Sequence, residues 1–329
     1  MTPLDSDFRV TVIIPFFQYR EGSLVSAVRS CLGQRKVEAL SVIVVDDGSP
    51  LPARQELAEL SDRENSRVSI IEQPNGGPGS ARNRGLSALP DDTNVVAFLD
   101  SDDQWDPDHI SNALGALAAG ADFYFSDYLP LGSTVSTFKQ CNLTPVTGQE
   151  LGSRQEIYTY TMDLFDALLV KSPVGTSTVV YRRSVSPDIR FRTDFSYGED
   201  VFFWMELAGR ARVIAFSTRF EALYGEGVNI AAGATWGSSA HLNRTYYDFA
   251  FHRAIAQSFR LTNEQIRWND SWMEEVAQSF VQSFLHLLRR SKPIDWWIMR
   301  CFVNARPKII LEIMMALFTI GWRGSRKHN

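Results

Sequence analysis

The segment NVVAFLDSDD, residues 94–103, joins an unbroken apolar run to three carboxylates within four positions. Apolar, β-branched runs of this length are typical of strands that are buried on both faces of a parallel sheet. The same pattern occurs earlier in VTVIIPFF (10–17) and LSVIVV (40–45), and helix-like segments such as EGSLVSAVRSCLGQ separate the runs. Strands that alternate with helices predict βαβ units, and therefore an α/β fold with a mainly parallel central sheet and flanking helices.

The second and third runs both end in carboxylates, Asp46 and Asp47 in one case and Asp100, Asp102 and Asp103 in the other. In open parallel sheets, ligands bind outside the carboxyl ends of the strands, where the loops gather. We therefore expect the two acidic strand ends to face one pocket.

The spacing of the acids in residues 100–103 suggests a cation site. In an extended segment, Asp100 and Asp102 project to the same side. Two such carboxylates suit Mg²⁺ or Mn²⁺ bridging to phosphate oxygens. Taken alone, the acids fit a solvated turn that caps the next helix equally well.

The bulk composition is that of a globular protein. With 329 residues, of which 44% are hydrophobic, the chain is long enough for a catalytic domain plus an appendage. The net charge of −5 gives no general attraction for nucleic acid, and the sequence carries no nucleic-acid-binding motif. We therefore expect no nucleic-acid partner.

Several features favour a cytoplasmic protein. The start MTPLDSDFRV lacks the basic and apolar regions of a signal peptide. Cys31, Cys141 and Cys301 are far apart and form no metal-ligand spacing, which fits a reducing compartment. No apolar run reaches the length of about 18 residues that a transmembrane helix needs.

The periodicity changes along the chain. From residue 121 to 235 it is mixed, whereas beyond residue 241 it becomes helical, with an apolar stripe in SWMEEVAQSFVQSFLHLLRR. We therefore divide the chain into an α/β domain over residues 1–235 and a helical region over residues 236–329.

Four motifs in order, VTVIIPFF, VIVVDDGS, NGGPGSARNRGL and VVAFLDSDD, carry a family resemblance, and YGEDVFFW at 197–204 adds to it. Together they resemble the N-terminal half of family 2 of the inverting nucleotide-sugar glycosyltransferases, which have the Rossmann-like GT-A fold. Each motif alone is unspecific, but the ordered set is not. The resemblance implies a GT-A domain that uses a nucleotide-sugar donor.

The resemblance assigns the nucleotide-binding residues. In the family, the acid pair after the second strand holds the nucleotide base, a role that falls on Asp47 with Asp46 beside it. Pro15 and Ser101 are assigned to the same nucleotide-contacting set, and Arg82 of the ARNRG motif would lie near the nucleotide.

The resemblance also assigns the metal ligands and the base. The D-x-D motif corresponds to Asp100-Ser101-Asp102, in which Asp100 would contact the ribose or the metal and Asp102 would ligate Mg²⁺ or Mn²⁺ under the diphosphate. The family's general base falls on Asp200, with Glu199 as the reserve candidate. A cation stabilises charge on the leaving diphosphate, and a carboxylate takes the proton of the attacking hydroxyl, which gives direct displacement with inversion.

The same motifs have ordinary structural explanations. Residues 46–49 could form a simple turn, and Glu199 and Asp200 would be favoured at a helix start by the helix dipole. Arg82 and Arg84 could be surface charges, which is the interpretation we favour for Arg84.

The sequence departs from the family pattern in two places. Many members have Asn shortly after the first strand, where this chain has Gln18. Many also place an Arg or His in the loop after the last strand, where this chain has Gly225-Glu226-Gly227. A late ligand for the metal or the diphosphate is therefore in question; His241 is a candidate, although a lone His is more often structural.

The function implied by the resemblance is sugar transfer, with glucose as the first choice, from a UDP-sugar to a lipid-linked or growing bacterial polysaccharide. The IIPFFQ opening and the Trp-rich tail look most like succinoglycan-type exopolysaccharide glucosyltransferases. The alternatives are a galactosyl- or other hexosyltransferase of lipopolysaccharide, O-antigen or capsule synthesis, and, from a different class, a non-catalytic nucleotide-sugar-binding scaffold. A dinucleotide-dependent dehydrogenase is disfavoured, because no G-x-G-x-x-G motif follows the first strand.

The C-terminal tail suggests membrane contact. Residues 289–329 carry nine Lys or Arg against two acids, a charge of +7, which leaves −12 on residues 1–288. The tail also contains Trp296, Trp297 and a nearly apolar run from Ile309 to Trp322, which suits a helix lying in the membrane interface. We expect peripheral contact at the inner face of the cytoplasmic membrane, the alternatives being a core helix or a homodimer interface.

Overall fold

The computed structural model describes residues 7–19, 21–130, 132–143, 150–151, 156–194, 197–225 and 234–325, with the side chains of residues 319–325 excepted. The chain forms two compact units, Met1–Asp194 with Glu199–Val228, and Phe195–Gly198 with Asn229–Asn329. We call them the α/β unit and the helical unit. The domain division after residue 235 remains a prediction; that position lies within the helical unit.

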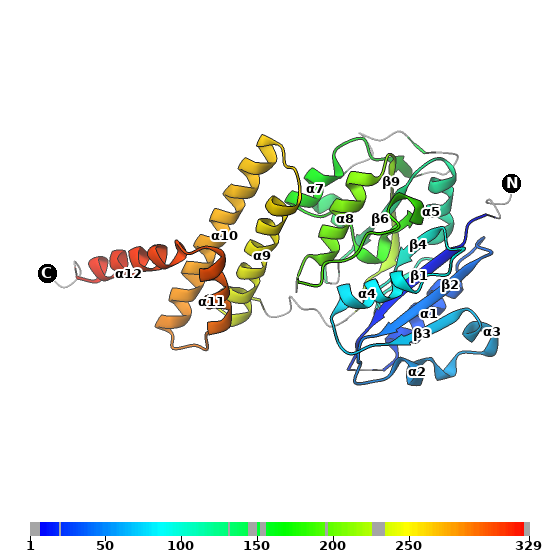
Figure 1. Cartoon of the computed structure of the whole chain (residues 1–329), viewed down its shortest axis with the longest axis horizontal. Helices are drawn as coiled ribbons and strands as arrows, with labels where there is room; N and C mark the ends of the chain where they lie inside the picture. The colour runs from blue at the N-terminus through cyan, green and yellow to red at the C-terminus, as the bar shows by residue number, and fades with distance from the viewer. Residues whose placement is uncertain are drawn as a thin grey trace. The chain divides into compact units, whose positions relative to one another are not determined.

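The α/β unit is built on one sheet, whose described strands number nine. They are β1 (Val10–Phe16), β2 (Leu40–Asp46), β3 (Val68–Glu72), β4 (Val95–Phe98), β5 (Gln104–Trp105), β6 (Phe123–Leu129), β7 (Ile157–Thr159), β8 (Val180–Arg182) and β9 (Ile214–Leu223). Their order is β3-β2-β1-β4-β8-β6-β9-β5, and β7 pairs with β9. Figure 1 labels β1, β2, β3, β4, β6 and β9 of this sheet.

The three apolar runs of the sequence are neighbouring parallel strands, as predicted. β1 lies between β2 and β4, with Val12 opposite Val42 on one side and Ala97 on the other. β3 extends the parallel part beyond β2. The carboxyl ends of β1, β2 and β4 therefore lie along one edge, where their acidic loops begin.

The second half of the sheet is mixed in direction, which explains the mixed periodicity of residues 121–235. β8 is antiparallel to both β4 and β6, and β9 is parallel to β6 but antiparallel to β5 and β7. The predicted α/β GT-A architecture is thus confirmed, with its parallel pairing concentrated in the first half of the sheet.

Helices cover the sheet. Those of the α/β unit are α1 (Ser23–Leu32), α2 (Ala53–Glu56), α3 (Asp62–Asn65), α4 (Pro78–Ser87), α5 (His109–Ala118), α6 (Thr137–Gln140), α7 (Leu164–Val170) and α8 (Glu199–Arg210), with the short 3₁₀ turns η1 (Leu57–Glu59), η3 (Thr176–Thr178) and η4 (Arg183–Val185). Val42 and Val44 of β2 belong to the same hydrophobic cluster as the buried side chains of α1. Ile43 and Val45 of β2 instead form a cluster with Ala81 of α4. Because side chains alternate along a strand, α1 and α4 cover opposite faces of β2.

A buried carboxylate joins α5 to the second half of the sheet. Glu221 of β9 contacts the His109 ring at 2.9 Å and accepts hydrogen bonds from Asn112 Nδ2 at 2.8 Å and Tyr124 Oη at 2.7 Å. Ser217 Oγ donates a further bond at 2.9 Å. A buried polar group of this kind is tolerated because its hydrogen bonds replace those lost to water.

The helical unit contains α9 (Ser239–Ser258), α10 (Asn263–Arg289), α11 (Trp296–Ala305) and α12 (Ile309–Ser325). The predicted stripe of α10 forms its core, with Val276, Phe280 and Phe284 buried against the neighbouring helices. Within the described residues, no helix is both long and apolar enough to cross a membrane.

The packing of α4 on β1 gives a first prediction. Gly→Ala in a helix interior normally stabilises by about 1 kcal/mol. At Gly85, however, an added Cβ would lie 2.5 Å from Ile13 Cγ2, and overpacking of a core costs about 1–3 kcal/mol. We expect Gly85→Ala to lower the free energy of unfolding, measured by urea titration.

Gly209 of α8 is the matched control, because an added Cβ there meets nothing within 4 Å. Gly209→Ala should leave the free energy of unfolding unchanged or raise it by up to about 1 kcal/mol. Equal effects at both positions would contradict the close approach of α4 to β1.

Candidate active site

The acidic loop that follows β4 contains carboxylates in two environments. Asp100 and Asp102 are half-buried, whereas the Asp103 side chain is buried and held on both oxygens. Ser177 Oγ donates to Asp103 Oδ2 at 2.5 Å, and Gly225 N donates to Oδ1 at 2.9 Å. Burial, with the charge of Asp100 next in importance, raises the pKa of Asp103 to about 8. Asp103 therefore serves the structure of the loop, and Asp100 and Asp102 remain the two acids placed for a ligand.

Arg82 of α4 connects this loop to a distant part of the chain. Its Nη2 donates to Asp100 Oδ1 at 2.7 Å, and its Nη1 donates to Glu199 Oε1 at 3.2 Å. Burial opposes the charge of Arg82, but Asp100 and Glu199 outweigh it and raise the pKa of the guanidinium above its usual value. Arg84, two residues further along α4, is exposed, as expected.

The two acids at the start of α8 differ in their partners. Glu199 pairs with Arg82, yet burial, followed by the neighbouring Asp200, raises the pKa of Glu199 to about 7. Asp200 Oδ2 accepts a hydrogen bond from Thr176 Oγ1 at 3.1 Å, and Oδ1 accepts from Val201 N at 2.8 Å. Glu199 is thus engaged by a cation and Asp200 by neutral donors.

The acid pair after β2 organises two loops. Asp46 accepts from Ser49 N and Ala53 N, both at 2.8 Å, and so closes the turn that leads into α2. Asp47 accepts from Gln73 Nε2 at 2.6 Å and from Gly76 N and Gly77 N at 2.8 Å.

The Asp47 contacts fix the NGG segment before α4. Gly77 has a φ of 83°, which favours glycine at this position.

Gln18 connects three strand ends. Its backbone N–H donates to Ser49 Oγ at 3.0 Å, and its Nε2 donates to Ser101 Oγ at 3.3 Å. The residue that stands where many family members have Asn thus links the loops after β1, β2 and β4. Pro15 lies within β1, opposite Val45 of β2.

The structure thus brings Arg82, Asp100 and Glu199 into direct contact. Sequence reasoning did not foresee Thr176, Ser177 or Gln73, because Ser, Thr and Gln carry no distinctive motif and their acidic partners are remote in sequence. The sequence offers one signal for the two hydroxyl residues, the run GTST at 175–178, which lies just before β8.

The donor set at the end of β4 fits a divalent cation. Among the residues described, no group of three or more His, Cys, Asp and Glu side chains is arranged to hold a metal. Mg²⁺ is usually held by one or two carboxylates together with substrate phosphates, so the pair Asp100 and Asp102 suffices for such a site. His241 lies in the helical unit, on the first turn of α9, where burial and then Arg244 lower its pKa. Its role as a late ligand stays a prediction.

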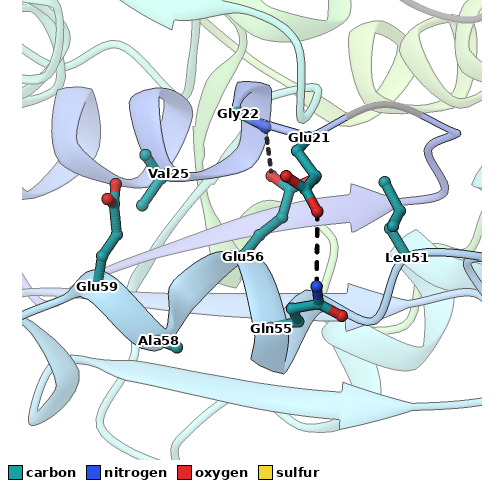
Figure 2. A pocket seen from close by; sticks show the side chains of 8 residues that line it. All are labelled: Glu21, Gly22, Val25, Leu51, Gln55, Glu56, Ala58 and Glu59. Carbon is teal, nitrogen blue, oxygen red and sulfur yellow. Dashed lines mark hydrogen bonds between the residues drawn. The ribbon is translucent and has the colours of Figure 1, made fainter.

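A cavity of about 490 Å³ lies away from these residues, between the start of α1 and α2 (Figure 2). Its acidic lining includes Glu21, Glu56 and Glu59. Glu56 Oε2 accepts from Gly22 N at 3.3 Å and Leu24 N at 3.2 Å, and so satisfies the first amides of α1. The cavity contains none of the predicted site residues, and its central acid is a helix cap.

Comparisons with known proteins identify the family of the chain. The sequence profile described as "Glycosyl transferase family 2" matches residues 11–186. The succinoglycan biosynthesis protein ExoW of Rhizobium meliloti (strain 1021) is 35% identical over 225 residues, which cover 68% of this chain and 70% of ExoW.

Two solved structures share the fold. One is S. aureus TarS 1-349 in complex with UDP-GlcNAc, which aligns with a TM-score of 0.56 and 17% sequence identity. The alignment covers 93% of this chain and 82% of the TarS chain. The mannosyltransferase PcManGT of Pyrobaculum calidifontis, in complex with GDP-Man and Mn²⁺, aligns with a TM-score of 0.55 and 15% identity over 95% of this chain and 85% of that one.

The buried position of Arg82 gives a second prediction. Arg82→Met keeps the length of the side chain but leaves Asp100 and Glu199 without their cation. Removing one partner of a buried ion pair costs about 3–5 kcal/mol, so the free energy of unfolding in urea should fall by that order.

The matched control is Arg84→Met on the exposed face of the same helix, which should change the free energy by no more than about 0.5 kcal/mol. If both variants are equally stable, Arg82 is not what holds the two acidic segments together.

Proposed function

Since the chain belongs to glycosyltransferase family 2, we propose that it transfers a sugar, with glucose as the first candidate, from a UDP-sugar to a lipid-linked or growing bacterial polysaccharide. Inversion at the anomeric carbon follows from direct displacement by the acceptor. The observation that carries the proposal is the contact of buried Arg82 with both Asp100 and Glu199. It brings the acids proposed for donor binding and those proposed for acceptor activation to one place.

The names of the similar proteins support the substrate classes. The relative ExoW is a succinoglycan biosynthesis protein, which favours a polysaccharide acceptor. The structural neighbours were solved with UDP-GlcNAc and with GDP-Man and Mn²⁺, which favours a nucleotide-sugar donor and a divalent cation.

The donor would be held by the loops at the carboxyl ends of β1, β2 and β4. A carboxylate has about four acceptor sites, and the three described hydrogen bonds to Asp47 leave one on Oδ2 for an N–H of the nucleotide base. Asp46, Pro15 and Ser101 complete the proposed nucleotide-contacting set.

Asp102 and Asp100 would hold Mg²⁺ or Mn²⁺, which when bound stabilises the negative charge that develops on the leaving diphosphate. Arg82 neutralises part of the charge on Asp100 and Glu199, and so reduces the repulsion between these acids.

Asp200 is our choice of general base. It would accept the proton of the acceptor hydroxyl as that oxygen attacks the anomeric carbon. Its partners are a hydroxyl and a backbone amide, whereas Glu199 is committed to the guanidinium of Arg82. Glu199 is therefore the reserve candidate.

The third prediction tests this assignment. Asp200→Asn should leave the affinity for UDP-glucose with Mn²⁺ nearly unchanged, because Asn keeps the shape and one acceptor oxygen. Turnover should fall by roughly 10²-fold or more, the scale of a positioned base. Donor binding is measured by calorimetry and turnover by release of UDP, across a panel of nucleotide sugars that includes UDP-galactose.

Asp102→Asn is the complementary variant, since it should weaken the metal-dependent binding of UDP itself. Full activity of the unaltered protein in EDTA would refute the metal assignment. A severe effect of Glu199→Gln beside a mild effect of Asp200→Asn would reverse the choice of base.

We further propose that the helical unit contacts the inner face of the cytoplasmic membrane. One face of α12 is buried, through Ile309 and Ile313, whereas the other is exposed and apolar. The exposed apolar side chains of α11 and α12 are Trp296, Trp297, Ile310, Leu311, Met314, Met315, Leu317 and Phe318. Exposed Trp beside an aliphatic helix face is typical of interfacial binding.

Ion pairs hold part of the charge of this region close to acids, and one of these acids, Glu274, lies outside the segment for which +7 was counted. Arg306 is tied to Glu274 and Glu312, both at 2.7 Å, and Lys308 lies 3.4 Å from Glu274. We therefore expect the apolar contribution to dominate and the salt dependence of membrane binding to be moderate.

The fourth prediction concerns this face. Met315 and Phe318 are 69% and 77% exposed, so Met315→Glu with Phe318→Glu should leave the fold intact. Inserting a Met or Phe side chain into an apolar phase gains about 1.5–3 kcal/mol, so the double variant should bind vesicles of phosphatidylglycerol and phosphatidylcholine at least about tenfold more weakly. Co-sedimentation at low and high salt measures the binding.

The control carries the same two substitutions elsewhere, Met162→Glu with Phe220→Glu, at side chains that are 51% and 58% exposed in the α/β unit. It should bind vesicles like the unaltered protein. If the α12 variant also binds unchanged, the membrane proposal fails. If it instead converts a dimer to a monomer in light scattering, the face is a homodimer interface.

A further inference from the structure

The 3₁₀ turn η3 (Thr176–Thr178) contacts both groups of acids of the proposed site. Ser177 is fully buried, and its Oγ accepts from Asp100 N at 3.0 Å while donating to Asp103 Oδ2 at 2.5 Å. Its carbonyl oxygen accepts from Trp105 Nε1 at 2.6 Å. Ser177 thus contacts Asp100 at the beginning of the acidic loop, Asp103 at its end, and Trp105 in the strand that follows.

The preceding residue of the same turn holds the proposed base. Thr176 is buried, and its Oγ1 donates to Asp200 Oδ2 at 3.1 Å. Val201 N holds the other oxygen at 2.8 Å, so the two contacts together set the rotation of the Asp200 carboxylate. Because Thr176 and Ser177 are adjacent in sequence, the acidic loop and the base are tied to neighbouring atoms of one turn.

The turn itself is held firmly from its other side. Tyr128 and Tyr224 stack with their ring centroids 4.4 Å apart, and a Cβ added to Gly175 would overlap both side chains. A shift of the turn toward this aromatic pair would therefore have to displace it. Such a support suits a positioning function, because a shift of a reacting group by about 1 Å is enough to cost 10²-fold in rate.

We propose that Thr176 and Ser177 are positioning residues, which set the place of the base Asp200 relative to the donor-binding acids Asp100 and Asp102. This inference rests on the function proposed above. Thr176 acts on the proton-accepting group and Ser177 on the backbone of the donor loop, so the two residues should affect different kinetic constants.

The experiment uses the full chain with Mn²⁺ and the nucleotide sugar that the unaltered protein hydrolyses fastest in a panel of UDP- and GDP-sugars. Thr176→Val removes the hydroxyl while conserving the shape. It should lower kcat about tenfold, the scale of lost orienting contacts around a site, with KM for the donor unchanged. Thr176→Ser keeps the hydroxyl and should restore most of kcat.

Ser177→Ala should instead raise KM for the donor and the Mn²⁺ concentration at half-maximal rate, each by about tenfold, because the acidic loop loses its anchor. Thermal unfolding shows that each variant is folded under the assay conditions.

Thr178→Val is the matched control. It removes a buried hydroxyl from the same turn, but one that donates to Gly175 O at 2.8 Å. Its kcat and KM should stay within about twofold of the unaltered protein.

The inference would be overturned by a loss of kcat in Thr178→Val as large as in Thr176→Val, or by a failure of Thr176→Ser to restore turnover. Failure of the proposed function has a different signature, since Asp200→Asn would then retain full turnover. The inference alone fails if Asp200→Asn is inactive while Thr176→Val turns over normally.

Discussion

The architecture of the site depends on one buried guanidinium. Arg82 is almost fully buried, and it is surrounded by the carboxylates of Asp100 and Glu199. Burying a charge is costly unless it is paired and hydrogen-bonded, so Arg82 can be buried only while its two acids lie beside it. This condition couples α4 and the end of β4, which follow one another in the chain, to the start of α8, where Glu199 is 117 residues beyond Arg82.

Because Arg82 must be paired, Glu199 and Asp200 have different hydrogen-bond partners. Glu199 compensates the cation, and Asp200 is left with neutral hydrogen-bond donors. Neighbouring carboxylates with different environments are a common way for a site to separate a structural acid from a reacting one. The geometry therefore supports a division of labour that the motif alone leaves open.

The strands in the first half of the sheet could be predicted from the sequence, because the pattern that indicates each strand lies within the strand itself. Continuous apolar runs buried on both faces identified β1, β2 and β4, and the acids that follow mark the edge on which the proposed site lies. β3 is an edge strand whose side chains are only partly buried, and β8 has three residues and pairs antiparallel to its neighbours, so neither left a comparable pattern. The contact between Arg82 and Glu199 spans 117 residues, and a hydroxyl such as that of Thr176 becomes informative only when its partner is known.

Gly225 illustrates how closely two of these segments share space. A side chain at this position would overlap the carbonyl oxygen of Asp102, and its N–H is already bound to Asp103. The end of β9 and the acidic loop therefore form a single packed unit in which neither backbone can be displaced without the other. A redesign of donor or acceptor preference should therefore exchange the acidic loop and the end of β9 together, and it should keep Gly225, whose missing side chain allows the two segments to pack closely.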